Sequence, residues 1–260
     1  MTEVTALVRS PGSRLAEGLL THLERHPIDV SLAMRQWQHY VNTLLRIGWD
    51  VIEVPGEEDC PDAVFIEDTA AVRGHVALIA RPGAESRRPE IEGTRRVLND
   101  LGYTIVDAAA PATLEGGDVL KLGATIYVGQ STRTNAAGAD ALRQAFGSQG
   151  VDVVQLPVEK VLHLKSGVTA LPDGTAVAYE PLFDLAAPFE KFLAVPEEPG
   201  AHVVVIDEGR VLMADSAPKT ADIYVARGLE VITVGISEFE KLEGCVTCLS
   251  IRLRDLPANA

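Results

Sequence analysis

The sequence has 260 residues, of which 47% are hydrophobic and 23% are charged, and its formal net charge is −14. This is the composition of a globular protein with room for one large core or two small ones. This negative charge disfavours a nucleic-acid surface unless the chain carries a local basic patch. Arg87-Arg88 and Arg95-Arg96 are only isolated pairs. No apolar run reaches the length of a membrane span, and the N-terminus lacks a signal-peptide pattern. Three cysteines cannot all pair, so we expect a reduced chain in the cytoplasm.

A pattern of helix, glycine and strand recurs along the chain. Apolar spacing and capping signals predict helices over 31–47, 89–101, 135–146 and 217–227. Each is followed by a strand, and the glycines at the expected helix C-caps are Gly48, Gly102, Gly150 and Gly228. A weaker fifth copy has a helix over 182–190 and a strand over 191–196, without the glycine.

Pairs of strands joined by short turns lie between these units. Turn residues between β-rich runs predict hairpins over 64–79, 119–128, 168–178 and 203–213. No continuous stretch supplies a fifth hairpin. The N-terminal strand over 4–9 and a strand around Cys248 could supply it together and close a ring.

The sequence therefore predicts an α/β protein with a single domain over residues 1–260, built from about five units with a period of roughly 40 to 50 residues. Closure into a ring would remove the exposed sheet edges. A doubly wound α/β sheet is the alternative, since it also alternates strands with helices. The hairpins favour the ring, because they indicate mixed rather than parallel sheets.

Cys248 lies in a stretch whose β-branched and alternating polar residues predict a strand. On that strand Cys248, Ser250 and Arg252 share one face, so we expect an exposed thiol on a polar face. Cys245 stands three residues earlier and leaves two other interpretations open. A zinc site would need a second ligand pair, which the sequence lacks at metal spacing. A redox pair normally lies at a helix N-terminus, whereas this one leads into a strand and Val246-Thr247 make a poor turn.

The starts of the expected hairpins are unusually polar, and equivalent units would bring them together around the axis of a ring. His163 and Cys248 can form a nucleophile–base pair, because an imidazolium stabilises a thiolate. Glu115 is the candidate carboxylate that orients the imidazole. Further carboxylates suit a cationic group such as guanidinium, and the candidates are Asp62, Glu67 and Asp68.

Each of these features also has a structural interpretation. His163 lies between leucines and could fill a core, and the Glu-Gly-Gly-Asp run that begins at Glu115 could be a plain turn. The acidic cluster around Asp68 could be a solvated strand edge. The residues alone leave these choices open.

Six stretches spread over nearly the whole chain point to one family. They are Phe65-Ile66-Glu67-Asp68-Thr69-Ala70, Arg81-Pro82-Gly83-Ala84 with Arg87-Arg88, Leu114-Glu115-Gly116-Gly117-Asp118-Val119-Leu120, 129–135, His163-Leu164-Lys165-Ser166 and 244–250. In this order they resemble dimethylarginine dimethylaminohydrolase, of the guanidine-modifying pentein superfamily. The resemblance implies a five-bladed α/β propeller of ββαβ repeats. It also implies hydrolysis of Nω-methylated L-arginines, such as asymmetric dimethylarginine and monomethylarginine, to L-citrulline and dimethylamine or methylamine.

The resemblance implies a role for each matching residue. Cys248 would be the nucleophile that forms a covalent thiouronium intermediate, His163 the general acid and base, and Glu115 its carboxylate partner. No metal and no organic cofactor is implied. The implied substrate-binding residues are Asp68 at the guanidinium with Asp62 and Glu67 nearby, Arg87 and Arg133 at the substrate carboxylate, Leu242 at the substrate amino group, and Leu20 in a mobile lid.

Alternatives to this activity stay within the same superfamily. An arginine deiminase-like hydrolase would act on arginine or another guanidino compound, but such enzymes, like amidinotransferases, are typically longer. Ring-shaped ribosome-binding relatives lack the Cys–His–acid set, and the net charge of −14 disfavours RNA contact. The expected partner is therefore a small-molecule substrate rather than nucleic acid or membrane. A homodimer is also expected, as is common among penteins of this kind.

Overall fold

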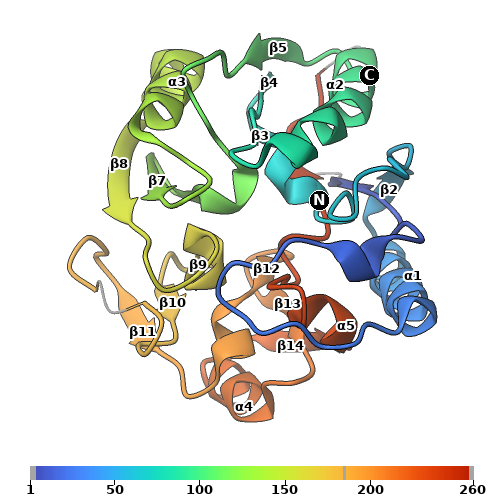
Figure 1. Cartoon of the computed structure of the whole chain (residues 1–260). Coiled ribbons are helices and arrows are strands. Elements are labelled where there is room, and N and C mark those ends of the chain that lie inside the picture. Colours follow the sequence, from blue (N-terminus) through green and yellow to red (C-terminus); the bar gives the residue numbers. More distant parts are fainter. Residues whose placement is uncertain (1–3, 184–185, 258–260) are drawn as a thin grey trace.

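The computed structural model describes residues 4–183 and 186–257, and these form five three-stranded sheets around a common axis (Figure 1). In every sheet the middle strand pairs antiparallel with one neighbour and parallel with the other. The sheet orders are β15-β1-β2, β3-β4-β5, β6-β7-β8, β11-β10-β9 and β12-β13-β14. Five separate sheets confirm the predicted five-bladed α/β propeller and exclude one doubly wound sheet.

The elements follow the predicted repeat closely. The strands are β1 (Thr5–Val8), β2 (Asp50–Glu53), β3 (Ala70–Arg73), β4 (Val76–Ile79), β5 (Thr104–Asp107), β6 (Val119–Leu122), β7 (Thr125–Gln130), β8 (Asp152–Pro157), β9 (Val168–Ala170), β10 (Ala176–Ala178), β11 (Phe192–Ala194), β12 (Val204–Val205), β13 (Arg210–Ala214), β14 (Glu230–Val234) and β15 (Ile251–Leu253). The α-helices are α1 (Val30–Arg46), α2 (Ile91–Asp100), α3 (Ala136–Phe146), α4 (Pro218–Ala226) and α5 (Ser237–Glu240). Four of the predicted helices are confirmed, and the short α5 is an addition.

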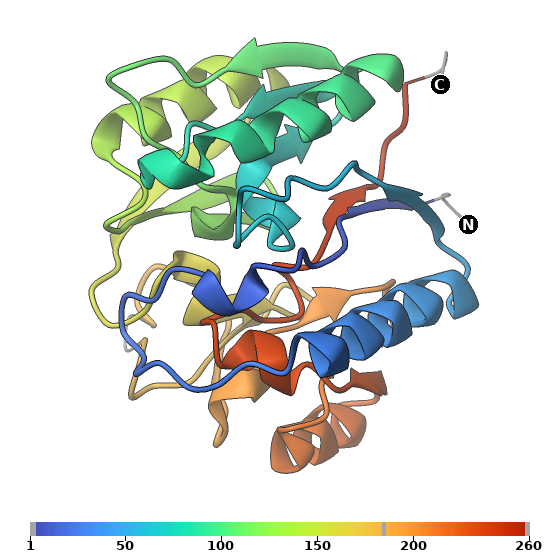
Figure 2. The same ribbon diagram turned by 45° about the vertical axis from the view of Figure 1, so that its right-hand side comes forward.

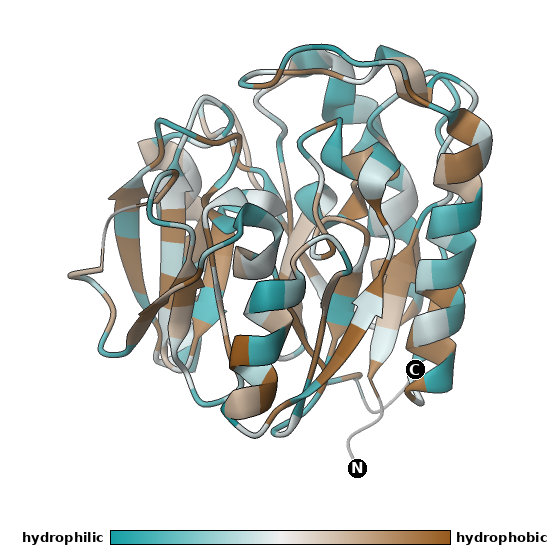
Figure 3. Cartoon of the chain, turned by 90° about the horizontal axis from the view of Figure 1, so that it is seen from below, coloured by the Kyte–Doolittle hydropathy of each residue, from teal (hydrophilic) through white to brown (hydrophobic). Residues whose placement is uncertain are grey.

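Helices α1 to α4 lie outside the ring of sheets (Figure 1). Helix α1 begins at an N-cap, where the Asp29 side chain accepts a hydrogen bond from the Leu32 amide, and it buries Trp37, Tyr40 and Leu44. Buried apolar residues of the described chain form five clusters, one at each junction of neighbouring sheets. Figure 3 shows the resulting pattern, with hydrophobic strands and helices of mixed hydropathy. Burial of these faces against neighbours stabilises the ring.

The first sheet closes the ring with strands from both ends of the chain. Strand β1 pairs antiparallel with β15, with Ala6 opposite Arg252, and parallel with β2. The blue and red strands lie side by side in Figure 2. This confirms the predicted closure, although β15 begins only at Ile251 and excludes Cys248.

The predicted helix over 182–190 is wrong. The described residues there form turns and bends, and a pair of residues, 184–185, lies outside the described chain. Pro188 explains the difference, because proline lacks an amide hydrogen and clashes with the preceding helical turn. Aromatic rings fill the place of the helix, with Phe189 against Tyr127 at 4.7 Å and against Phe183 at 6.2 Å between ring centroids.

No helix in the described part of the chain combines the length and the apolar character that crossing a membrane requires.

The four predicted C-cap glycines all adopt positive φ, at 91° for Gly48, 81° for Gly102, 69° for Gly150 and 88° for Gly228. An L-residue in this region costs about 1–2 kcal/mol, because its Cβ approaches the following carbonyl. Three of them directly follow the C-caps of α1, α2 and α4, whereas Gly150 caps the 3-10 turn Gly147–Gln149 that follows α3. All four turn the chain towards the next strand.

This backbone requirement can be isolated at Gly228, where an added Cβ would meet no atom within 4 Å. We expect Gly228→Ala to lower the free energy of unfolding by about 1 kcal/mol through backbone strain alone. The matched control is Gly147→Ala, where φ is −58° and space is equally open, and there we expect no loss. Chemical denaturation of both variants measures the difference, and equal stabilities would contradict it.

Candidate active site

Three hairpins begin with a single 3-10 turn, and these turns meet at the axis of the ring. They are Ile66–Thr69, Gly116–Asp118 and Leu164–Ser166. A Cβ added at Gly116 would lie 1.9 Å from the Glu67 carbonyl oxygen, and one at Gly117 would lie 2.6 Å from His163 Nδ1. Only glycine permits such close approach. The Glu-Gly-Gly-Asp run is therefore a turn, as its composition allows, and also the place where three units pack together.

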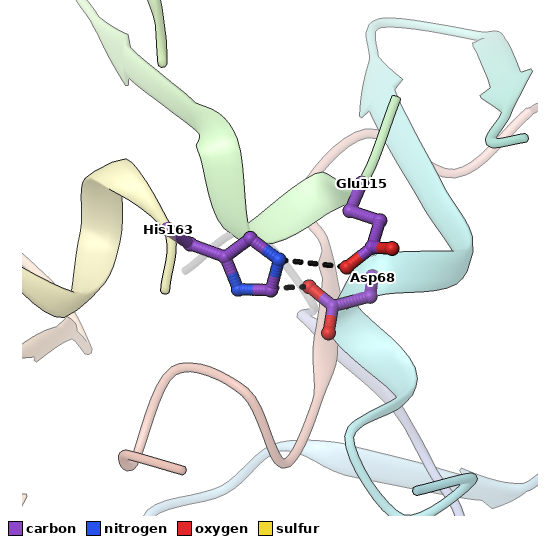
Figure 4. A group of neighbouring side chains, drawn as sticks. All are labelled: Asp68, Glu115 and His163. Carbon is purple, nitrogen blue, oxygen red and sulfur yellow. Dashed lines mark hydrogen bonds and ion pairs between the residues drawn. The ribbon is translucent and has the colours of Figure 1, made fainter. Parts of the chain in front are cut away.

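His163 lies between two carboxylates that come from different hairpins (Figure 4). Its Nε2 is 2.7 Å from a Glu115 carboxylate oxygen, and its Nδ1 is 3.8 Å from an Asp68 oxygen. All three side chains are buried. Burial disfavours the charged imidazole, but Asp68 and the hydrogen bond to Glu115 outweigh it and raise the pKa of His163 to about 9. His163 is therefore an imidazolium at neutral pH rather than a neutral core histidine.

Arg87 balances the buried carboxylates from the other side. Its guanidinium donates to Asp68 Oδ2 at 2.8 Å, binds Glu90 at 2.8 Å and lies 3.5 Å from Glu115. Burial raises the pKa of Asp68, but His163 and Arg87 outweigh it and lower that pKa to about 2. Burial likewise opposes ionisation of Glu115, and the His163 hydrogen bond and Arg87 lower its pKa overall. Asp68 and Glu115 are thus ionised although they are buried.

A small pocket opens onto this group, and Cys248 lies in its wall. The other lining residues are Leu19, Asp62, Phe65, Asp68, Arg87, Arg133, Leu162, His163, Leu242, Glu243 and Gly244. The pocket brings together seven of the ten residues predicted for the site, and the eighth, Glu115, is hydrogen-bonded directly behind His163. Side chains from both ends of the chain and from three hairpins share this wall.

The expectation of an exposed Cys248 on a strand is wrong. The residue is 5% exposed and lies in a turn, where its amide donates to the Cys245 carbonyl at 3.1 Å. The Cys248 sulfur lies 3.3 Å from the Cys245 sulfur. The hydrogen bond with Cys245 and burial raise the pKa of the Cys248 thiol well above its ordinary value. The described residues include no hydrogen bond from Cys248 to His163, so the two face the pocket as separate groups.

Glu67 does not reach the pocket through its side chain. Its carboxylate binds Lys165 at 2.5 Å and also contacts Arg252, and these residues line a second, wider cavity. Only the backbone of Glu67 approaches the site, where its amide donates to the Cys248 carbonyl at 3.2 Å. The Glu67 carboxylate therefore points away from this pocket, because adjacent residues in the 3-10 turn point to opposite sides, and its place near the substrate stays a prediction.

The N-terminal segment also differs by one residue from the prediction. Leu19 rather than Leu20 lines the pocket, and the Leu19 amide donates to both Asp62 carboxylate oxygens, at 3.1 and 3.2 Å. Leu20 packs against the core cluster beneath it. Burial raises the pKa of Asp62, against the opposing effect of Arg87 and the Leu19 amide. Sequence spacing alone could not separate two adjacent leucines.

Glu243 and Gly244 are functional candidates that the sequence did not identify. The Glu243 carboxylate accepts hydrogen bonds from the amides of Thr21, His22 and Leu23 and so holds this segment beside the pocket. Gly244 leaves room for Phe65, whose ring would lie 2.3 Å from an added Cβ. The partners of the Glu-Gly pair before Cys245 are more than 170 residues away in sequence, so neither role could be inferred from neighbouring residues.

Asp68, Glu115 and His163 offer ligand atoms that lie within 4.8 Å of one another, which is the spacing of a metal site. Their lone pairs are already engaged. Asp68 accepts from the Gly117 amide at 2.9 Å and from Arg87, and Glu115 accepts from His163. A divalent cation here would have to displace the Arg87 guanidinium. The donor set therefore fits hydrogen bonding to cationic nitrogen better than metal ligation.

Comparison with known proteins identifies the chain. It is 56% identical, over 98% of its length and 99% of the relative, to N(G),N(G)-dimethylarginine dimethylaminohydrolase of Streptomyces coelicolor. It is 34% identical, over 95% of its length and 98% of the relative, to the protein of the same name from Pseudomonas aeruginosa. A family model described as N,N dimethylarginine dimethylhydrolase, eukaryotic, matches residues 22–184.

Solved structures agree with this comparison. A dimethylarginine dimethylaminohydrolase adduct with S-methyl-L-thiocitrulline superposes with a TM-score of 0.89 at 32% identity, over 97% of this chain and 100% of the other. A mutant of the Pseudomonas aeruginosa enzyme in complex with citrulline has the same TM-score, identity and coverage. The N-terminal domain of the arginine dihydrolase ArgZ shares the fold, with a TM-score of 0.85 at 19% identity. The chain is therefore a member of the dimethylarginine dimethylaminohydrolase family, with the pentein fold.

Proposed function

We propose that this protein hydrolyses Nω-methylated L-arginines to L-citrulline and methylamine or dimethylamine. The observation that carries the proposal is the pocket in which a cysteine sulfur, an imidazolium and buried carboxylates converge, in a chain 56% identical to a named enzyme of this activity. The carboxylates match a planar cation, which they can bind through paired hydrogen bonds. The chemistry requires a nucleophile and a proton donor, and both line the same pocket.

Substrate binding is assigned from charge. The buried carboxylates of Asp68 and Asp62 line the pocket and would hold the guanidinium of the substrate. Arg133 also lines the pocket, and its buried Nη1 has no hydrogen-bond partner although it lies 3.6 Å from a Glu115 carboxylate oxygen, so we assign it to the substrate carboxylate. Arg87 is bound by Asp68 and Glu90, so its main effect is to set the charge of the site. The Leu242 backbone completes the proposed contacts at the substrate amino group.

The nucleophile is activated by the substrate in this scheme. The Cys248 thiol is neutral in the free protein, because its hydrogen bond with Cys245, burial, and the charges of Glu67 and Asp68 raise its pKa. A guanidinium placed beside the sulfur favours the thiolate instead. The thiolate then attacks the guanidinium carbon, and the C–S bond forms as the bond to the methylated nitrogen begins to break.

His163 transfers protons in both halves of the reaction. As an imidazolium with a pKa of about 9, it protonates the departing amine, and the C–N bond breaks to leave a thiouronium on Cys248. The neutral imidazole then takes a proton from water, which attacks the same carbon. Collapse of that adduct breaks the C–S bond and releases citrulline. Glu115 orients the ring throughout through its 2.7 Å hydrogen bond.

Arginine remains the second candidate substrate, because the arginine dihydrolase fold neighbour shows that this architecture also accommodates a hydrolase of arginine. We also propose a cytoplasmic location and a homodimer. The three free, buried cysteines support a reducing compartment. The homodimer rests on the family expectation alone, and sedimentation equilibrium tests it directly.

The first test is citrulline formation from asymmetric dimethylarginine, monomethylarginine, arginine and agmatine. We expect the methylated arginines to be preferred, Cys248→Ser to abolish turnover, and Cys60→Ser to retain it, since Cys60 lies outside the pocket. Arg133→Gln should lower kcat/KM for dimethylarginine roughly ten- to a hundredfold, the effect of losing a charged hydrogen bond. Arg96→Gln on the surface is the matched control. Turnover by Cys248→Ser, or preference for arginine, would refute the proposal.

A second test addresses the proton donor. Glu115→Gln removes the charge and the anionic hydrogen-bond acceptor that favour the imidazolium, so the pKa of His163 should fall from about 9 towards 6.5. Proton transfer to the leaving amine should then decline at high pH earlier than in the wild type. NMR titration of the His163 ring measures the pKa, with Glu58→Gln on the surface as the control. An unchanged ring pKa in Glu115→Gln would exclude Glu115 as its partner.

A third test addresses the thiol. In the free protein we expect alkylation of Cys248 by iodoacetamide to rise with an apparent pKa above 9, the ordinary value of the thiol, for the reasons given above. Mass spectrometry of the peptide that contains Cys248 follows the reaction, and glutathione titrated in parallel gives the unperturbed comparison. Full reactivity at neutral pH would show that the thiolate exists before substrate binds and would contradict activation by substrate.

A further inference from the structure

We propose that Cys245 and Cys248 are an oxidation site, at which a peroxide converts the two thiols into a reversible disulfide that removes the nucleophile. The disulfide itself depends only on the two sulfurs. Its effect on activity rests on the proposed function, in which Cys248 attacks the substrate. Nothing in the mechanism above requires Cys245, so its place beside the nucleophile calls for another explanation.

The two sulfurs are already close to bonding position. They lie 3.3 Å apart, and an S–S bond of about 2.05 Å needs only a small rotation of the side chains. The hydrogen bond from the Cys248 amide to the Cys245 carbonyl closes a four-residue turn. A turn of this kind brings its end Cα atoms to less than about 7 Å, which overlaps the range of about 4.4–6.8 Å between Cα atoms in disulfides.

Surrounding groups hold this turn in place. The Tyr40 hydroxyl donates to the Val246 carbonyl at 3.1 Å and contacts the Ser250 hydroxyl at 2.8 Å. Arg252 donates to the Thr247 carbonyl at 2.6 Å. Val246 and Thr247 made a poor turn by their own preferences, but these tertiary contacts fix it. A fixed turn lowers the entropy that closing the disulfide would otherwise cost.

The chemistry needs one oxidant, a hydroperoxide such as hydrogen peroxide. Cys248 meets it first, because Cys248 lines the pocket and Cys245 does not. The Cys248 thiol loses its proton and the thiolate attacks the peroxide, so that an S–O bond forms as the O–O bond breaks, and the departing hydroxide takes that proton to leave as water. Cys245 then attacks the sulfenic sulfur, and the S–S bond forms as the S–O bond breaks. The Cys245 proton leaves with that oxygen as a second water.

The disulfide has two consequences for the protein. It stops catalysis, since neither sulfur can attack while they are joined. It also protects Cys248, because a sulfenic acid without a partner thiol proceeds to the irreversible sulfinic acid. A dithiol reductant restores both thiols by exchange. Oxidation of the two cysteines to the disulfide thus stops activity reversibly rather than permanently.

The test uses the full-length wild type, Cys245→Ser and Cys60→Ser, each treated with hydrogen peroxide and compared with its own reduced form. Cys60 is a matched control, because it is a buried free cysteine whose sulfur contacts the Ser86 carbonyl rather than another thiol. We expect the wild type to fall from three alkylatable thiols to one, to lose two hydrogens in mass, and to yield a peptide that links Cys245 to Cys248. Dithiothreitol should restore both thiols and at least about nine-tenths of its citrulline formation, as full reversal by exchange implies.

The variants separate the switch from simple damage. Cys60→Ser should behave as the wild type, whereas Cys245→Ser should lose activity that dithiothreitol does not restore. The proposal is overturned if the oxidised wild type keeps three alkylatable thiols, or if Cys245→Ser recovers as completely as the wild type. Thiol counting and mass need no substrate. If the oxidised protein contains the disulfide but the reduced protein makes no citrulline, the proposed function is refuted and the oxidation site is still supported.

Discussion

The ion network around Arg87 is the constraint on which the site depends. Asp68, Glu90 and Glu115 are all removed from water, and a buried carboxylate without a partner is strongly destabilising. One guanidinium that reaches all three, together with the His163 imidazolium, makes their burial tolerable. The carboxylates of Asp62 and Asp68 also line the pocket, where a cationic substrate group can bind them. Stability of the centre and recognition of the substrate thus come from one set of charges.

Local patterns predicted most of the fold. These patterns depend only on residues that are neighbours in sequence: a glycine after each helix, β-rich runs separated by turn residues, and apolar residues at helical spacing. The repeating units and their number could therefore be predicted from the sequence. The pairing of β1 with β15 followed because a ring with four hairpins lacks one. The predicted helix over 182–190 is wrong because Pro188 interrupts it. The predicted strand at Cys248 is wrong because Tyr40, which is far away in sequence, and the nearby Arg252 hold the β-branched residues in a turn.

The sequence predicted which residues belong to the site but not how their side chains are arranged. Polar hairpin starts and the family motifs indicated Cys248, His163 and Glu115, and the structure places them around one pocket. Which way a side chain points from a 3-10 turn depends on packing, so Asp68 and its neighbour Glu67 could not be told apart. Glu67 instead joins Lys165 and Arg252 in the lining of the wider cavity. The role of Glu243, which binds backbone amides near residue 22, depends on tertiary structure alone.

The closure of the first sheet by both chain ends has a consequence for synthesis. The ribosome makes β1 (Thr5–Val8) more than 240 residues before β15 (Ile251–Leu253), so one edge of β1 stays without its partner during that part of synthesis. A nascent chain that has not yet reached Cys248 lacks the nucleophile, and one that has not reached β15 leaves the first sheet open. Removal of β15, which begins a few residues after the turn that carries the reactive sulfur, would therefore expose an edge of β1.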